Sequence, residues 1–276
     1  MSWRIGVCTG VCTERPILGI LDAIDASGVR GLEFSTPTHH FAPWEPAQVD
    51  AVAARLHGSP LVPVSMHAPF GGRLDLSDGD PHRLQDTIQT VLASAQALSR
   101  LGGRVLVAHP TDIVRAGEDV LARLERAAAS LRTLTQGCKR LGVTLAIESP
   151  LPHLVGGHPD EFAWLLERVG PDARVCLDTG HTSLGGHWHR FVELAGDRLV
   201  HVHAHDNHGH FDDHLPPGEG RIDWHDITRT LQQVRYTGWI ILELKCPEEP
   251  LVGYFARAFE QAHRLLNGGE RRELAS

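Results

Sequence analysis

The sequence predicts a single (β/α)₈ barrel, the TIM-barrel architecture. First, the chain has 276 residues, close to the roughly 250 that one such barrel usually needs. Second, short β-branched segments alternate with longer helical patterns from end to end, eight of each. Strands joined by crossover helices require a parallel sheet covered on its outer face. An open doubly wound sheet is the competing arrangement, but no Gly-x-Gly-x-x-Gly motif follows the first strand.

The predicted strands are short apolar segments, and most of them end on a polar residue. In chain order they are Trp3–Thr9 (WRIGVCT), Gly31–Ser35 (GLEFS), Val62–His67 (VPVSMH), Arg104–His109 (RVLVAH), Val143–Ser149 (VTLAIES), Arg174–Asp178 (RVCLD), Leu199–His205 (LVHVHAH) and Trp239–Leu244 (WIILEL). Several short strands alternating with helical patterns of this length are typical of βα units.

The predicted helices lie between these strands and are bounded by residues that favour helix ends. Asp80-Pro81 and Pro159-Asp160-Glu161 mark starts, and glycines such as Gly102 and Gly142 mark ends. In chain order the helices cover residues 15–27, 46–57, 81–101, 117–141, 159–169, 187–196, 223–235 and 250–267. We expect one domain over residues 1–267 and a flexible tail over residues 268–276.

The composition excludes several classes of protein. The formal charge is −8, from 26 basic and 34 acidic residues, whereas proteins that coat nucleic acid carry basic stripes. The apolar segments are too short to cross a bilayer. The first residues, MSWRIGVCTG, do not follow the pattern of a secretory signal. We therefore expect a cytoplasmic protein with no membrane association, and nothing in the sequence implies a protein partner.

Five scattered cysteines predict neither a disulfide framework nor a cysteine-based zinc site. Cys8 and Cys12 are the one close pair, and no C-x-x-C motif is present. Reduced thiols in the core or in loops are the expectation.

Histidine is the outlier in the composition. The chain contains 19, about three times ordinary usage. The densest cluster is His201, His203, His205, His208, His210 and His214. Residues two apart share one face of a strand, so we expect His201 to lie deeper in the interior and His205 to lie behind a metal site or to face substrate.

Residues that bind metals stand at the carboxyl ends of successive strands, where barrel enzymes carry their active sites. A buried carboxylate costs several kcal/mol unless it is paired or metal-bound. Each residue alone could be an ordinary polar strand end, but Lys245 is the one basic residue beside them. We therefore predict nine metal ligands: His67, His109, Glu148, Asp178, His181, His203, Asp212, His214 and Glu243.

The mixture of imidazole and carboxylate ligands favours zinc, with manganese or iron(II) as alternatives. Nine ligands are enough for two to three divalent ions per chain. Among the other polar residues, Arg221 is predicted to clamp a phosphate or carboxylate of the substrate, or to pair with Asp223. His39 and His40 are expected in a solvated loop.

These motifs together resemble the xylose isomerase-like TIM barrels, also called the apurinic/apyrimidinic endonuclease family 2 fold. The resemblance spans essentially the whole chain, and the ordered set of motifs is more specific than any one of them. The motifs are Ser65-Met66-His67-Ala68-Pro69, His109-Pro110, Ile147-Glu148-Ser149, Leu177-Asp178-Thr179-Gly180-His181, His203-Ala204-His205-Asp206-Asn207, Asp212-Asp213-His214 and Leu242-Glu243-Leu244.

Two branches of this superfamily imply different functions. The resemblance to endonuclease IV implies three metals. The first would be held by His67, His109 and Glu148, and the second by Glu148, Asp178, His203 and Glu243. The third would be held by His181, Asp212 and His214. With all nine positions filled, we expect a phosphoester hydrolase that activates water. Its substrate would be a small phosphorylated molecule or a nucleic acid, and Glu148 and Glu243 are the expected catalytic residues.

The alternative is a sugar or sugar-phosphate isomerase or epimerase. That branch keeps one metal, held here by Glu148, Asp178, His203 and Glu243, and it uses Glu148 and Glu243 as the acid/base pair. A barrel that binds a metal or ligand without catalysis is a third interpretation.

Overall fold

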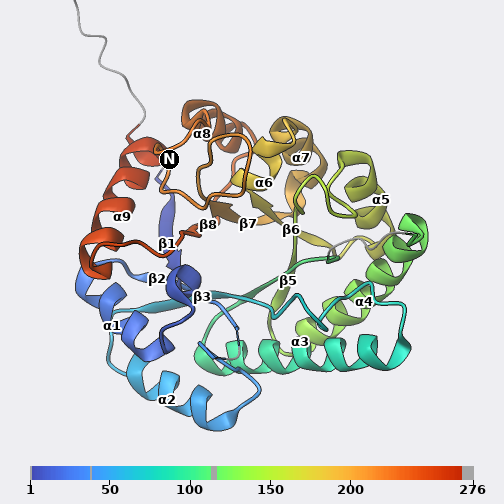
Figure 1. Ribbon diagram of the computed structural model, residues 1–276, viewed down its shortest axis with the longest axis horizontal. Helices are drawn as coiled ribbons and strands as arrows, with labels where there is room; N and C mark the ends of the chain where they lie inside the picture. Colours follow the sequence, from blue (N-terminus) through green and yellow to red (C-terminus); the bar gives the residue numbers. More distant parts are fainter. Residues whose placement is uncertain (1, 38, 113–116, 269–276) are drawn as a thin grey trace, which may run out of the picture.

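Eight parallel strands close into a barrel in the order in which they occur in the sequence (Figure 1). The computed structural model describes residues 2–37, 39–112 and 117–268. The strands are β1 (Arg4–Cys8), β2 (Gly31–Phe34), β3 (Val62–His67), β4 (Val105–Ala108), β5 (Thr144–Glu148), β6 (Arg174–Asp178), β7 (Leu199–Ala204) and β8 (Trp239–Leu242). Pairing of β1 with β8 closes the sheet, with Gly6 opposite Ile241.

Helices form a ring around the barrel and cover its outer face (Figure 1). They are α1 (Ile17–Ser27), α2 (Pro46–Leu56), α3 (Pro81–Leu101), α4 (Val120–Arg140), α5 (Pro159–Val169), α6 (Thr179–Leu184), α7 (Trp188–Ala195), α8 (Trp224–Gln233) and α9 (Leu251–Asn267), with 3-10 turns η1 (Thr9–Cys12) and η2 (Gly196–Arg198). In α4, Leu124, Leu131 and Leu134 are buried at helical spacing. The predicted fold class is therefore confirmed, while α6 is a helix that the sequence analysis did not predict.

Alternation along the strands decides which side chains enter the barrel. Outward-facing residues such as Leu106, Ile147 and Leu177 join the large core between sheet and helices. Inward-facing residues of the same strands include Val107 and Cys176, which pack in a separate interior cluster. The inward positions nearest the carboxyl ends are polar, so the strands deliver these groups to one mouth of the barrel.

The two ends of the described chain lie side by side. The backbone N–H of Trp3 donates to Asn267 at the end of α9, and the Asn267 side chain donates back to the Trp3 carbonyl. Residues 269–276 of the predicted tail lie outside the described residues. No helix in the described part of the chain combines the length and the hydropathy that crossing a bilayer requires.

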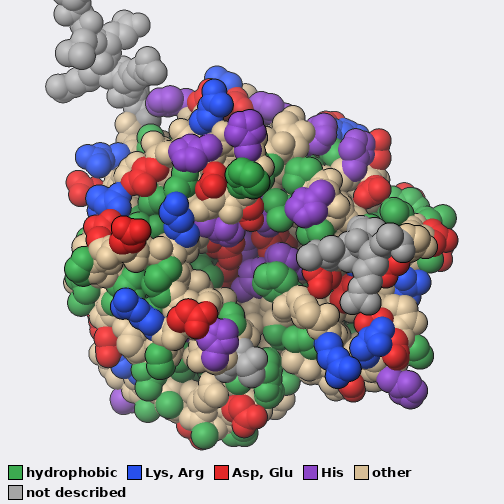
Figure 2. Space-filling model, viewed as in Figure 1, with side chains coloured by type: hydrophobic (Ala, Val, Ile, Leu, Met, Phe, Trp, Pro, Cys, Tyr) green, Lys and Arg blue, Asp and Glu red, His purple; other side chains and the backbone are tan. Residues whose placement is uncertain are grey.

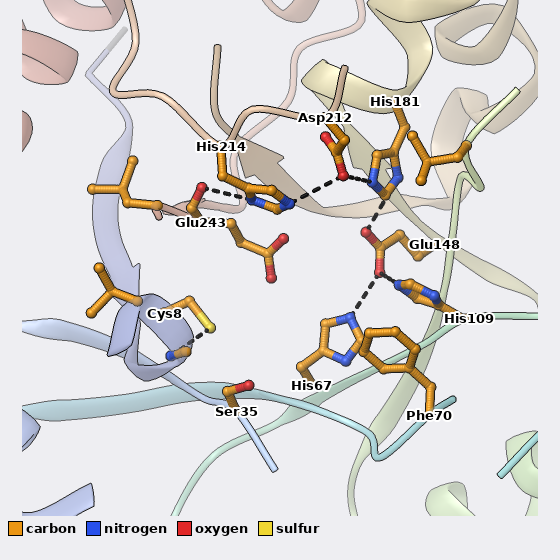
Figure 3. Close-up of a pocket in the computed structure, with 14 residues that line it drawn as sticks. Cys8, Ser35, His67, Phe70, His109, Glu148, His181, Asp212, His214 and Glu243 are labelled. Carbon is orange, nitrogen blue, oxygen red and sulfur yellow. Dashed lines mark hydrogen bonds and ion pairs between the residues drawn. The ribbon is translucent and has the colours of Figure 1, made fainter. Parts of the chain in front are cut away.

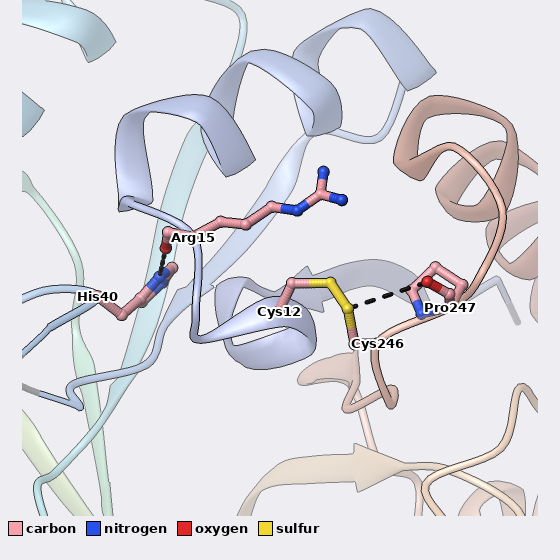
Figure 4. Close-up of a disulfide and its surroundings, with 5 residues drawn as sticks. All are labelled: Cys12, Arg15, His40, Cys246 and Pro247. Carbon is pink, nitrogen blue, oxygen red and sulfur yellow. Dashed lines mark hydrogen bonds between the residues drawn. A yellow bond between two sulfur atoms is a disulfide. The ribbon is translucent and has the colours of Figure 1, made fainter.

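The prediction that all five cysteines are reduced is wrong for two of them. Cys12 and Cys246 form a disulfide (Figure 4). It joins η1, which follows β1, to the loop between β8 and α9. The pair is separated by 234 residues in the sequence, but closure of the barrel makes β1 and β8 neighbours. The disulfide therefore ties the first and last βα units together at the carboxyl-terminal mouth.

His40 also differs from the expectation of a solvated loop. Its side chain is buried, Nδ1 donates to the Arg15 carbonyl at 2.7 Å (Figure 4), and Nε2 lies 3.0 Å from the Thr9 hydroxyl. A buried imidazole needs hydrogen-bond partners. His40 finds both in the segment after β1, and it thereby links that segment to its own segment after β2. The adjacent His39 is exposed, as expected.

We expect Cys246→Ser to lower the free energy of unfolding by about 2–4 kcal/mol, the usual effect of losing a disulfide. Denaturant unfolding measures it, and Cys138→Ser, at a buried free cysteine, is the control for the chemical change alone. Dithiothreitol should destabilise the wild type but not Cys246→Ser. Five reactive thiols, rather than three, in the denatured, unreduced wild type would show that no disulfide forms.

Candidate metal centre

A cavity of about 240 Å³ opens at the carboxyl-terminal mouth of the barrel. Figure 2 shows this mouth as a hollow in which histidine and acidic side chains gather. The lining residues are Cys8, Gly10, Val11, Ser35, His67, Phe70, His109, Glu148, Leu151, His181, Asp212, His214, Glu243 and Leu244. The described lining therefore contains no Lys or Arg.

Four predicted ligands from neighbouring strands meet at one point of this mouth. Glu148 ends β5, Asp178 ends β6, His203 lies in β7 and Glu243 directly follows β8. One ligand atom from each lies within 4.8 Å of the others. His203 Nδ1 lies 3.2 Å from Glu148 Oε1 and 3.5 Å from Glu243 Oε2. Figure 3 shows the Glu243 carboxylate facing the pocket across from Glu148.

Burial makes this arrangement of carboxylates unfavourable without a cation. The side chains of Glu148 and Asp178 are 1% and 0% exposed, and that of Glu243 is 13% exposed. Burial alone raises the pKa of Glu148, but the charges of His109 and His203 outweigh it and hold this pKa well below its usual range. Three carboxylates with one imidazole are a donor set suited to zinc, manganese or iron(II). The residues therefore fit a divalent ion.

Two further predicted ligands contact Glu148 from the opposite side. His67 Nε2 and His109 Nε2 lie 3.1 Å and 3.0 Å from the same oxygen, Glu148 Oε2 (Figure 3). The other nitrogen of His67, Nδ1, donates to the Ala68 carbonyl at 2.9 Å. Burial lowers the pKa of His67, but the hydrogen bond and charge of Glu148 raise it to about 9. Both imidazoles thus act as hydrogen-bond partners of Glu148 in this structure.

The remaining predicted ligands gather around Asp212 in the loop after β7. Asp212 Oδ2 lies 3.3 Å from His181 Nε2 and 3.1 Å from His214 Nε2 (Figure 3). Against the effect of burial, Asp178 and Asp212 raise the pKa of His181 to about 10, and Asp212 raises that of His214 to about 9. The structure therefore brings all nine predicted residues to one mouth, in three adjoining groups.

Local structure places His181 beside Asp178. Asp178 is the N-cap of α6, and its Oδ1 accepts the backbone N–H of His181 at 2.7 Å. Gly180 lies between them because the His205 ring packs against it: a Cβ there would come within 1.9 Å of His205 Cε1. This close approach holds the start of α6 against β7.

The two predicted substrate-binding residues lie outside the cavity lining. His205 is fully buried and its Nε2 donates to Asp178 Oδ2 at 3.0 Å, so it supports a carboxylate of the centre. Arg221 is exposed, and its backbone N–H donates to the Asn207 carbonyl. Asp223, its alternative partner, instead caps α8 by accepting the N–H groups of His225 and Asp226.

Two buried carboxylates were missed by the sequence analysis. Glu33 in β2 is fully buried and contacts His201 and His203. Asp206 accepts the indole N–H of Trp224 and the backbone N–H groups of Gly218 and Ile222, which holds the loop that carries Asp212 and His214. A charged residue in an otherwise apolar strand, GLEF, was the available signal for Glu33.

We expect the metal-free protein to become less stable as the pH rises from 7 to 10. The folded-state pKa values of His67, His181 and His214, about 9, 10 and 9, lie above their ordinary value of 6.5. Their protonation therefore contributes stability that is present below pH 6.5 and is lost as the pH passes these raised values. Thermal unfolding in a chelator measures the effect. A flat melting temperature over this range would contradict the prediction, and His214→Gln should make the decline shallower.

Comparison with known proteins corrects the predicted activity. A putative hydroxypyruvate isomerase of Streptomyces coelicolor is 24% identical over 263 residues, 88% of this chain and 91% of that protein. An uncharacterised protein of Methanocaldococcus jannaschii is 26% identical over 197 residues, so the match spans 67% of this chain and 65% of that protein. The solved structure of a D-tagatose 3-epimerase-like protein superposes with a TM-score of 0.83 at 21% identity, covering 96% of this chain and 98% of that one.

The phosphoester hydrolase prediction is therefore wrong, because the relatives whose names state an activity are named as isomerases and epimerases. A nucleic acid substrate is not supported either. The physical reason is that a mouth rich in imidazole and carboxylate groups can hold metal for either reaction, so the ligand set does not select hydrolysis. The set Glu148, Asp178, His203 and Glu243 is common to both interpretations, and His67 and His109 can serve Glu148 as hydrogen-bond donors.

The family itself follows from a match over nearly the whole barrel. The model of the xylose isomerase-like TIM barrel family matches residues 21–266, from within α1 almost to the end of α9. The closed barrel with its ordered polar strand ends agrees with that match. This chain belongs to the xylose isomerase-like TIM barrel family.

Proposed function

We propose that this protein is a divalent-metal-dependent isomerase or epimerase of a small keto sugar. The observation that carries the proposal is the cluster of Glu148, Asp178, His203 and Glu243, of which Glu148 and Glu243 line the cavity. A bound divalent ion would polarise the carbonyl and hydroxyl oxygens of the sugar and stabilise the negative charge that develops on them. The names of the isomerase and epimerase relatives agree with this chemistry.

Glu148 and Glu243 are the proposed proton carriers. One carboxylate removes the proton from the carbon next to the carbonyl, and the electron pair of that C–H bond forms an enediolate. The other carboxyl group returns a proton to carbon, which either inverts that centre or moves the carbonyl. Their environments differ, since Glu148 contacts the imidazoles of His67, His109, His181 and His203, whereas Glu243 contacts that of His203. Such a difference suits an acid and a base with separate roles.

The cavity favours an uncharged sugar over a phosphorylated one. Its described lining carries carboxylates and imidazoles but no Lys or Arg, and the predicted clamp Arg221 is exposed outside it. Protein sites usually bind phosphate through Arg, Lys or a helix N-terminus. Phe70 packs against His109 with ring centroids 4.1 Å apart and the rings tilted by 31°, and it supplies an apolar wall for the carbon backbone of a sugar.

The metal is proposed to be zinc, with manganese or iron(II) as alternatives. One ion in the four-residue cluster suffices for the isomerase chemistry, and the two to three ions predicted from the sequence stay a prediction. The cytoplasmic location also stays a prediction. The Cys12–Cys246 pair gives it a test, because cytoplasmic thiols are normally kept reduced.

Proton exchange with solvent tests the proposed reaction. The metal-loaded enzyme is incubated in D₂O with a panel of ketoses, and NMR detects deuterium at the carbon next to the carbonyl together with the new isomer. We expect deuterium incorporation and turnover for at least one unphosphorylated ketose, and weaker turnover of its phosphate ester. The proposal would be overturned if the metal-loaded enzyme showed no deuterium exchange and no isomerisation with any of the ketoses or their phosphates.

A further inference from the structure

A second buried cluster lies one layer deeper in the barrel than the cavity. Its members, Glu33, Ser65, His201 and His203, are each at most 1% exposed. Glu33 Oε2 accepts the Ser65 hydroxyl at 2.7 Å and the His201 Nε2–H at 3.0 Å. His203 Nε2 lies 3.0 Å from Glu33 Oε1 and 3.2 Å from Oε2. Three side chains from two other strands therefore converge on one carboxylate.

The two nitrogens of His203 face different groups. Nε2 contacts Glu33 below, while Nδ1 contacts Glu148 and Glu243 in the cavity floor. A neutral imidazole has one N–H and one lone pair. Carboxylates face both nitrogens of His203. A divalent ion among Glu148, Asp178 and Glu243 would take the place of a proton on Nδ1, and Glu33 would then hold the one remaining N–H on Nε2, which leaves the Nδ1 lone pair to the ion. A lone pair in that direction is the arrangement that a metal ion requires.

We infer that Glu33 is a positioning residue that makes His203 a metal ligand through Nδ1. This inference rests on the proposed metal site, since it concerns the affinity of that site. The pairing orients the imidazole ring and increases its basicity, as carboxylates behind ligating histidines do in metalloproteins. Ser65 and His201 also bind the Oε2 atom of Glu33, and these two contacts hold the carboxylate beside His203.

Metal affinity, measured apart from activity, is the test. Metal-free wild type and variants are titrated with Mn²⁺ in competition with a chelator, and circular dichroism confirms folding. Glu33→Gln keeps a hydrogen-bond acceptor without charge, and Glu33→Leu removes both. We expect the Kd for Mn²⁺ to rise about 10-fold in Glu33→Gln and up to about 100-fold in Glu33→Leu. Glu219→Gln, the control, neutralises a glutamate that is paired with Arg257 outside the cavity lining, and it should change the Kd less than about twofold.

Nitrogen NMR of the zinc-loaded protein gives an independent readout. In the wild type we expect the His203 ring proton on Nε2, with the signal assigned by its disappearance in His203→Gln. In Glu33→Leu we expect the proton to be no longer confined to Nε2. If Glu33→Leu misfolds, Glu33→Gln still allows both measurements.

The outcomes separate this inference from the proposed function. If the wild type binds no Mn²⁺, or if His203→Gln binds it as tightly as the wild type, the proposed metal site fails and the inference fails with it. If His203→Gln weakens binding while both Glu33 variants match the wild type, the inference alone is overturned. It is also overturned if the Glu33 variants lose one whole equivalent of metal at unchanged Kd, because Glu33 would then be a ligand itself.

Discussion

Glu148→Gln and Glu243→Gln are each expected to lower turnover by about 10²–10⁴-fold, the range that general acid–base catalysis contributes. A glutamine amide has nearly the shape of the carboxylate but cannot accept a proton from carbon or return one. Both glutamates lie within 4.8 Å of the other ligands, so each substitution also removes a charge from the proposed metal site. The reaction should therefore be measured with saturating metal, which restores occupancy and leaves the loss of proton transfer visible.

Deuterium exchange and isomer formation should fall together in these two variants. Glu219→Gln is the matched control, since Glu219 is a glutamate paired with Arg257 outside the cavity lining, and it should retain wild-type turnover. The acid/base assignment would be wrong if either active-site variant, with metal bound, kept more than about a tenth of wild-type turnover. A variant that still exchanges deuterium but forms no isomer would identify its glutamate as the group that returns the proton.

The fold could be predicted because each βα unit carries its own local signals. Strands β3 and β6 have the predicted limits, Val62–His67 and Arg174–Asp178. The short helix α6 was not predicted, because its six residues carry too little periodicity to separate a helix from a turn. The prediction of eight parallel units also fixed which ends of the strands would meet. The convergence of residues as distant as His67 and Glu243 follows from that geometry alone.

Contacts that arise only after the barrel closes could not be predicted in the same way. The Cys12–Cys246 disulfide depends on the proximity of η1 to the loop after β8, and nothing in the local sequence indicates that pairing. Glu33 was missed because the search considered the ends of strands, whereas Glu33 lies inside β2. A register shift between Leu32 and Glu33 against β3 places it opposite Ser65, and such irregularities leave no mark in a pattern of period two.

The activity was wrongly predicted because residue type does not fix the role of an imidazole. Histidine can ligate a metal, donate to a carboxylate or carry a proton, and all three roles suit a crowded barrel mouth. His67 and His109 each direct Nε2 at one oxygen of Glu148. His201, which the sequence places in the interior, is hydrogen bonded to Glu33. The histidines at such a mouth therefore do not decide by themselves between hydrolysis and isomerisation, and the number of metals stays a prediction.

Removing the metal is expected to abolish turnover and to lower the melting temperature. An ion that binds only the folded state stabilises it by about 2.7 kcal/mol when its concentration is 100 times its Kd. In addition, the carboxylates of Glu148, Asp178 and Glu243, which meet within 4.8 Å, crowd one another without it. Thermal unfolding before and after chelation, followed by addition of Zn²⁺, Mn²⁺, Co²⁺ or Mg²⁺, measures the effect and ranks the metals.

The destabilisation by chelator should be larger at pH 9 than at pH 7. At pH 7 the imidazolium groups of His67, His181 and His214, with pKa values raised to about 9, 10 and 9, offset part of the carboxylate charge in the metal-free protein. As the pH approaches these values the imidazoles lose their protons, and the ion becomes the remaining source of positive charge. Asp178→Asn should lose most of the metal-dependent shift at both pH values, whereas Glu219→Gln should keep it. Equal melting temperatures with and without chelator in the wild type would contradict the prediction. They would mean that the protein's own positive charges neutralise the carboxylates at this mouth and that no metal ion is needed there.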